Sequence, residues 1–136
     1  MVIAFLMMNP FHHKLYKGDF DGGGEYNGYV AFDGVLPESC QGSSTWDDYD
    51  NTLDSMVHVH GGITFDNPMV ALLKEPIIPL TPIPDRDTLK TLRCIGFDTL
   101  HCDDTRERWP IEAIEAETIR LMEQIEKLLK DGNKCK

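Results

Sequence analysis

The sequence predicts an α+β fold in which one long C-terminal amphipathic helix packs on a mainly antiparallel sheet. Two observations predict this class. Short segments rich in β-branched and aromatic residues fill the chain up to residue 109, separated by glycine, proline and polar residues, and a helical apolar repeat occupies residues 110–132. The 136 residues, 41% of them hydrophobic, fit one domain spanning residues 1–136, with a strand- and loop-rich part (1–109) before the helix.

The chain carries a formal net charge of −10 and shows no cluster of lysine and arginine. Such a surface repels nucleic-acid phosphates and anionic lipids. We therefore expect no direct nucleic-acid binding and no membrane partner. The charge either keeps the protein soluble or mimics a polyanion that blocks a nucleic-acid-binding protein.

The four cysteines, Cys40, Cys94, Cys102 and Cys135, form no CxxC pair and are irregularly spaced. This pattern favours free thiols in a reducing cytoplasm over a zinc ribbon or a disulfide framework. The apolar segment MVIAFLMMNPF lacks the basic region and the small-residue cleavage site of a signal peptide, and it is too short to span a bilayer. We expect a cytoplasmic protein in which this segment is a first strand or a packed arm.

Predicted loops and strands alternate through the next part of the chain. Residues 12–25 are polar and contain three consecutive glycines, which indicates a flexible loop. YNGYVAF (26–32) has the tyrosine, valine and phenylalanine content of a strand. Residues 33–54 are rich in glycine, serine, aspartate and asparagine, and predict a long exposed loop that is either mobile or functional, with one short helical turn near Trp46–Tyr49.

The segment MVHVHGGITF, residues 56–65, alternates between apolar valines and other side chains. The alternation predicts a strand that presents His58 and His60 on one face. Gly61 and Gly62 permit a bulge or a close approach of another backbone.

Two more segments precede the helix. Residues 67–76 form a short helix or another strand, and the prolines of EPIIPLTPIPD exclude that stretch from a helix interior or a central strand. This proline-rich stretch is expected to cross the surface as a stiff connector, or to bind an aromatic groove of a partner. Within residues 87–104, LRCIGFDTL predicts a buried strand, and HCDDTRERWP leaves the sheet.

The helix predicted over 110–132 begins at Pro110, which suits a first helical position, and Gly132 can close it. Glutamates occupy its first turns and lysines its last, as the helix dipole favours. Its apolar stripe packs on the sheet of the same chain, or pairs with a second copy in a homodimer through residues 110–130.

Polar side chains with metal-binding chemistry follow two of the predicted strands. If MVHVH and CIGFD are neighbouring strands, His60 and Asp98 meet at their ends, with His101 and Asp104 just beyond. Two imidazoles and one or two carboxylates suit a divalent metal such as zinc, manganese, iron or nickel, so His60, Asp98, His101 and Asp104 are the candidate ligands. Without a metal, the same groups provide a general base held by a carboxylate, and the glycines let a phosphate approach backbone N–H groups.

Each of these residues also has an ordinary structural interpretation. His58 is typical of a half-buried strand histidine that bonds a neighbour, and the glycines are typical of a bulge. Asp98 can cap the turn after its strand, and Asp103 or Asp104 can serve the start of the final helix.

Three motifs, YNGYV, VHGGITF and GFDTLH-CDD, occur in this order between Tyr26 and Asp104. They resemble the motifs Tyr-x-Gly-Tyr-Val, Val-His-Gly-Gly-Leu-Thr and Gly-Phe-Asp-Cys-Ala-His-x-x-Asp of a family of small, mostly phage-encoded proteins. The resemblance implies a phage or prophage accessory protein in the host cytoplasm and implies no particular activity. It favours His60 over His58 and marks these motif positions: His60, Gly61, Gly62, Thr64, Gly96, Phe97, Asp98, His101 and Asp104.

The chain departs from the family pattern at Thr99-Leu100, where the pattern has Cys-Ala. A cysteine ligand or nucleophile at that position is therefore lost here, unless Cys102 substitutes for it. The predicted ligand-binding residues are His60, Gly61, Gly62, Thr64, Asp98 and His101.

Three functions are consistent with these features. The first is a binding protein for a small phosphorylated or nucleotide-derived molecule, which in a phage setting sequesters a host defence signal. The second is a metal-dependent hydrolase. The third is an acidic inhibitor that binds a host protein through residues 38–54 and the final helix.

Overall fold

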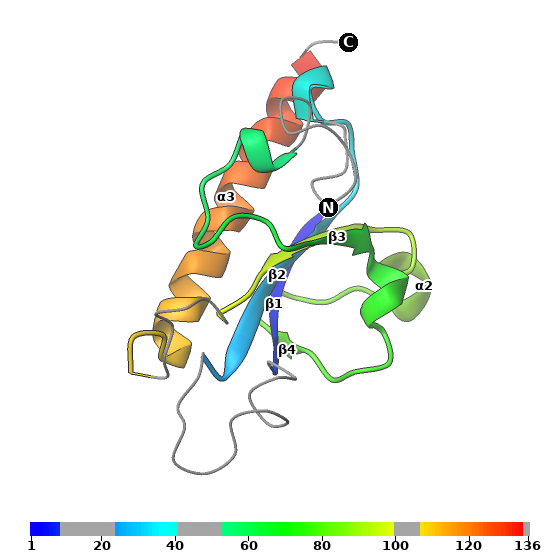
Figure 1. The fold of residues 1–136 in the computed structure, drawn as a ribbon. Helices are drawn as coiled ribbons and strands as arrows, with labels where there is room; N and C mark the ends of the chain where they lie inside the picture. Colours follow the sequence, from blue (N-terminus) through cyan, green and yellow to red (C-terminus); the bar gives the residue numbers. More distant parts are fainter. Residues whose placement is uncertain (9–23, 41–52, 100–106, 135–136) are drawn as a thin grey trace.

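The computed structural model describes residues 1–8, 24–40, 53–99 and 107–134 (Figure 1). Five antiparallel strands form one sheet in the order β3-β5-β2-β1-β4, and the helix α3 (Ile111–Lys134) packs on it. The strands are β1 (Val2–Met8), β2 (Tyr26–Phe32), β3 (Phe65–Pro68), β4 (Ile78–Pro79) and β5 (Arg93–Phe97). The predicted α+β class is confirmed.

The sheet is buried on both faces, which explains why β1 is a continuous apolar run. Figure 1 shows α3 on one side of the sheet and the segment that contains α2 (Arg86–Leu89) on the other. A strand covered on both faces needs apolar side chains at every position rather than at alternate ones. Residues 3–7 are accordingly all buried.

The core between the sheet and α3 joins alternate strand residues to the helix stripe. Leu6, Val30 and Phe97 project toward α3 and contact its buried apolar residues, which are Ile114, Leu121, Ile125, Leu128 and Leu129. Burying this stripe provides the main driving force for seating the helix, because apolar area removed from water contributes about 25 cal/mol per Å². The stripe therefore packs on the sheet of its own chain, as its periodicity allowed.

The segment expected to be a long exposed loop contributes to this same core. Leu36, Cys40 and Leu53 are at most 5% exposed, and short 3-10 helices occupy Glu38–Cys40 (η1) and Leu53–Ser55 (η3). The expectation of a fully exposed loop over 33–54 is wrong for these parts, because their apolar side chains complete the core beside α3. The helical turn predicted near Trp46–Tyr49 lies outside the described residues.

The strand predicted over residues 56–65 is also wrong. Val57 to Val59 have no regular structure, His60 and Gly61 form a turn, and β3 begins only at Phe65. Gly61 and Gly62 have φ angles of 70° and 80°, which a regular strand does not contain. The alternation was misleading here, because the backbone of His58 bonds the side chain of Gln124 instead of a neighbouring strand.

The opposite face of the sheet is covered by residues 69–92. Ile3, Phe5 and Cys94 pack there beneath a group from the covering segment that includes Met69, Leu89 and Leu92. Residues 67–76, predicted as a short helix or a strand, supply both the end of β3 and the 3-10 helix η4 (Met69–Leu72).

The proline-rich stretch lies at the edge of the sheet, where its missing N–H groups cost least. Ile78 and Pro79 pair with Leu6 and Phe5 as the short strand β4, and both are exposed. The N–H of Leu80 donates to the carbonyl of Ala4 at 2.9 Å. The expected surface position is confirmed. Among the described residues, no helix combines the length and the apolar character needed to cross a membrane.

α3 lies in close contact with the sheet at Gly28 in β2. A Cβ atom at this position would lie 2.1 Å from Thr118 Oγ1 and 2.5 Å from a ring carbon of Phe97. The Thr118 hydroxyl is fixed, because it donates to the carbonyl of Ile114 at 2.7 Å. Only glycine therefore allows α3 to lie this close to β2.

Replacing Gly28 by alanine is expected to lower the free energy of unfolding by about 1–3 kcal/mol, the usual cost of overpacking a core. Urea denaturation measures this change. Combining Gly28→Ala with Thr118→Ala should cost less than the sum of the two single changes, because the second removes the clashing hydroxyl. If the free-energy changes of the two single variants simply add, the contact between Gly28 and Thr118 does not limit how closely α3 packs on β2.

Tyr29 connects β2 to the opposite face, where its ring stacks on Phe5 with centroids 5.5 Å apart and meets Phe65 edge-on at 5.7 Å. Burial raises the pKa of Tyr29 from 10.0 to about 12, although a hydrogen bond with Asn27 opposes the shift. The folded state therefore retains this proton to higher pH than the unfolded state does.

The free energy of unfolding should fall as the pH rises from about 10 to about 12, because only the unfolded state loses the Tyr29 proton in that range. Tyr29→Phe is expected to remove this contribution, on the order of 2 kcal/mol, from the alkaline loss of stability. Urea unfolding across this pH range measures it. Tyr26→Phe is the control, and an equal effect of both changes would contradict the assignment.

Candidate functional site

The turn that carries the predicted histidine is built from two left-handed glycines. The N–H of Gly62 donates to the carbonyl of Val59 at 2.9 Å and closes a tight turn through His60 and Gly61. Positive φ angles at Gly61 and Gly62 suit glycine, because a side chain is strained in that region. A Cβ atom at Gly62 would also come within 3.2 Å of Asp54 Oδ1.

Two side chains hold the segment 53–63 in place. Asp54 Oδ1 accepts from the N–H of Ile63 at 2.7 Å. Gln124 of α3 binds both polar groups of the His58 backbone: its Oε1 accepts from the N–H at 2.8 Å, and its Nε2 donates to the carbonyl at 2.9 Å. The side-chain amide thus satisfies His58 as a neighbouring strand would. Figure 1 shows this green segment running beside α3 before it enters β3.

An open pocket of about 420 Å³ lies between this segment and the first half of α3. The ring of His60 packs against the indole of Trp109, with centroids 4.1 Å apart and an angle of 41° between the planes. Trp109 is placed there because it immediately precedes Pro110 and the start of α3. The pocket is lined by Asp54, Val57, His58, Val59, His60, Gly62, Trp109, Glu117 and Arg120.

The described residues that line this pocket include two carboxylates, Asp54 and Glu117, and the guanidinium of Arg120. Glu117 and Arg120 lie one turn apart on α3, and Arg120 Nε donates to Glu117 Oε1 at 2.9 Å while a second guanidinium nitrogen contacts the same oxygen. The Arg120 side chain is 52% exposed and that of Glu117 is 16% exposed. An exposed guanidinium is available to an incoming anion, since a surface ion pair contributes little by itself.

Several predicted site residues lie in or beside this pocket. His60 and Gly62 line it, and so does His58. The two histidines were expected on one face of a strand, and they reach the same pocket from a turn instead. Gly61 is exposed within the turn.

Thr64 and Asp98 lie at the sheet itself. The N–H of Thr64 donates to the carbonyl of Gly96 at 2.9 Å, and Phe65 pairs with Gly96 in the register of β3 and β5. The entry to β3 and the exit from β5 at Asp98 are therefore at the same end of the sheet. The expectation that MVHVH and CIGFD are neighbouring strands is wrong, because residues 56–60 form no strand and β5 pairs with β2 and β3.

The remaining two members of the predicted metal site, His101 and Asp104, lie outside the described residues. Within residues 1–8, 24–40, 53–99 and 107–134, no group of three or more histidine, cysteine, aspartate or glutamate side chains is arranged to hold a metal ion.

Position 99, where the chain departs from the phage family pattern, has a structural role. Thr99 is fully buried, its hydroxyl donates to the carbonyl of Tyr26 at 2.8 Å, and its N–H donates to Asn27 Oδ1 at 3.1 Å. These bonds connect the end of β5 to the start of β2. Cys102 lies outside the described residues.

Sequence reasoning missed the contribution of α3 to the pocket. The apolar repeat predicts only that residues 110–132 form an amphipathic helix, and it does not place Trp109, Glu117, Arg120 and Gln124 beside the histidines. The available signal was the i, i+3 pair of Glu117 and Arg120 on the polar face, preceded by a tryptophan at the start of the helix. That signal gives no information about which segment the polar face meets.

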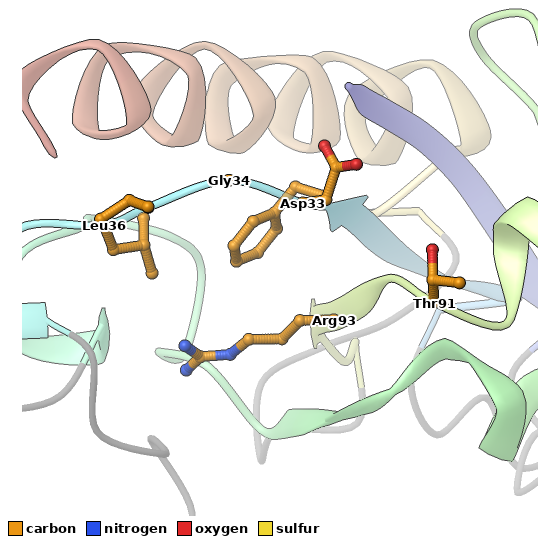
Figure 2. Close-up of a pocket in the computed structure, with 7 residues that line it drawn as sticks. Asp33, Gly34, Leu36, Thr91 and Arg93 are labelled. Carbon is orange, nitrogen blue, oxygen red and sulfur yellow. The ribbon is translucent and has the colours of Figure 1, made fainter. Parts of the chain in front are cut away.

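A second pocket of about 420 Å³ lies between the end of β2 and the start of β5 (Figure 2). Its lining residue Arg93 binds Asp66 through two hydrogen bonds of 2.8 and 2.6 Å, and the Asp66 side chain is only 3% exposed. Figure 2 shows Arg93 extending beneath the segment that contains Leu36, with the Asp33 carboxylate turned away from it. The charge of Arg93 is thus matched within the protein.

Neither described cysteine is an activated nucleophile. Cys40 and Cys94 are buried free thiols. Burial raises the pKa of both, and the nearby Arg93 only partly offsets the shift at Cys40. A raised pKa keeps each thiol protonated at neutral pH and therefore weakly nucleophilic.

Comparison with protein-family models, with curated proteins and with solved structures finds no match to this chain.

Removing the Gln124 amide should loosen the histidine turn. Gln124→Ala is expected to lower the free energy of unfolding by about 1 kcal/mol and to make Trp109 more accessible to acrylamide, because His60 no longer stays packed on it. Trp46→Phe leaves Trp109 as the only tryptophan for this quenching measurement. Glu123→Ala is the control, because Glu123 is the exposed residue directly before Gln124 on α3. Unchanged quenching in Gln124→Ala would show that the turn is fixed without the amide.

Proposed function

We propose that the pocket between the segment 53–63 and α3 binds a small phosphorylated or nucleotide-derived molecule. The observation that carries this proposal is the His60–Trp109 ring pair in a pocket that also contains the exposed guanidinium of Arg120. An aromatic surface beside a cation is the combination that recognises a base and a phosphate together.

The chemistry of each group supports a separate part of the ligand. The His60 and Trp109 rings form an aromatic surface at the pocket wall, and stacking of a base on such a surface contributes about 1–3 kcal/mol. Arg120 offers N–H donors to a phosphate oxygen and exchanges its bond with Glu117 for that contact. His58 adds a further donor or acceptor at the pocket wall.

The segment that forms the pocket wall is held in place by hydrogen bonds within the protein. Asp54 and Gln124 fix it at Ile63 and His58, at positions on either side of the His60 turn. Such bonds lower the entropy cost of binding, because a wall that the protein itself holds does not have to be ordered by the ligand. This favours a binding role even for a shallow site.

In biological terms, we propose a phage-type accessory protein that sequesters such a molecule in the host cytoplasm and so counteracts a host defence. The resemblance of YNGYV, VHGGITF and GFDTLH-CDD to motifs of small phage-encoded proteins supports this part of the proposal. Sequestration requires binding without turnover, which agrees with a pocket built from stacking rings rather than from an activated nucleophile.

Purified protein should release a nucleotide-derived molecule on denaturation, detected by mass spectrometry, and should be stabilised by one or more members of a nucleotide panel in thermal-shift assays. His60→Ala and Arg120→Ala are each expected to weaken binding about tenfold or more, since each removes a stacking or charge-assisted contact. Arg86→Ala, an exposed arginine on α2 across the sheet, is the matched control.

No released ligand and no thermal shift with any nucleotide would overturn the proposed function. Retention of biological activity by His60→Ala and Arg120→Ala would instead favour an acidic inhibitor that acts on a host protein through another surface.

A further inference from the structure

The size and charge of the His60–Trp109 pocket restrict the ligand beyond its general class. The pocket volume of about 420 Å³ is near the lower end of the roughly 300–1,000 Å³ that small-molecule sites occupy. This volume suits one base with its sugar, and the single ring pair offers one stacking position.

The electrostatics of the pocket oppose a highly charged ligand. Among the described lining residues, Asp54 and Glu117 supply two carboxylates and Arg120 supplies one guanidinium. Within the Glu117–Arg120 pair, water screens the Glu117 charge less, because its side chain is 16% exposed and that of Arg120 is 52% exposed. The chain as a whole has a net charge of −10, which adds to the repulsion of polyanions.

We infer that the pocket selects a single nucleoside unit carrying at most one negative charge, as a free nucleoside or a phosphodiester, and that Glu117 is the residue that discriminates against polyphosphates. This inference rests on the proposed function. Arg120 donates to the one negatively charged oxygen of a phosphodiester, whereas each further phosphate charge adds repulsion from the Glu117 carboxylate beside it.

Glu117 acts through its position beside Arg120. Its carboxylate oxygen accepts from the guanidinium, so it both orients Arg120 and neutralises part of its charge. In Glu117→Gln the amide oxygen can still accept from Arg120, but the negative charge is gone. This variant therefore separates the electrostatic role of Glu117 from its role in positioning Arg120.

Titration calorimetry at pH 8 with a nucleoside, its 3′,5′-cyclic monophosphate, and its mono-, di- and triphosphate, for each of the four bases, tests the inference. For the preferred base, we expect affinity to fall about twofold to fivefold for each negative charge beyond the first at low salt, and the fall to shrink at high salt. Glu117→Gln should reduce the ratio of cyclic monophosphate to triphosphate affinity about twofold to fivefold.

Glu126→Gln is the matched control. It removes the same charge from α3, but Glu126 is exposed on the side of the helix opposite to Glu117. In Glu126→Gln the ratio of cyclic monophosphate to triphosphate affinity should stay at the wild-type value. Thermal unfolding checks that both variants fold. Affinity that rises from the cyclic monophosphate to the triphosphate would overturn the inference and leave the proposed function standing. Failure to bind any member of the four series would overturn both.

Discussion

The seating of α3 on β2 is the constraint on which the rest of the molecule depends. The helix can approach the sheet only because Gly28 leaves room for Thr118, and this contact sets how far α3 lies from the strands. The buried stripe through Ile114, Leu121 and Ile125 then stabilises that position. Every helix residue of the candidate site depends on it, because their side chains reach the histidine turn only from a correctly placed helix.

A second constraint fixes the other wall of the site. β3 pairs with β5 through the backbone at the edge of the sheet. The two hydrogen bonds between the side chains of the buried Asp66 and Arg93 connect the same two strands. Removing one partner of a buried pair leaves an uncompensated charge, so such pairs hold a register strongly. The pairing of β3 with β5 also places the residues before β3, including the His60 turn. Gln124 then links this segment to α3.

Local sequence patterns predicted the helix and the strands that only need some apolar surface to pack against. The apolar repeat of α3, the aromatic and β-branched content of β2 and the apolar run of β5 each specify a buried surface that many neighbours could cover. Residues 56–65 have an equally clear alternation and yet form a turn. The reason is a bond to Gln124, 66 residues away in the sequence, which satisfies the His58 backbone without a neighbouring strand.

By itself the sequence determined the α+β class, the amphipathic helix and the surface position of the proline-rich stretch, because periodicity and missing N–H groups are local properties. Only the tertiary structure decided what His60 meets. Trp109, Glu117 and Arg120 come together with it through the packing of α3 on the sheet, and long-range packing of this kind leaves no fixed spacing in the chain.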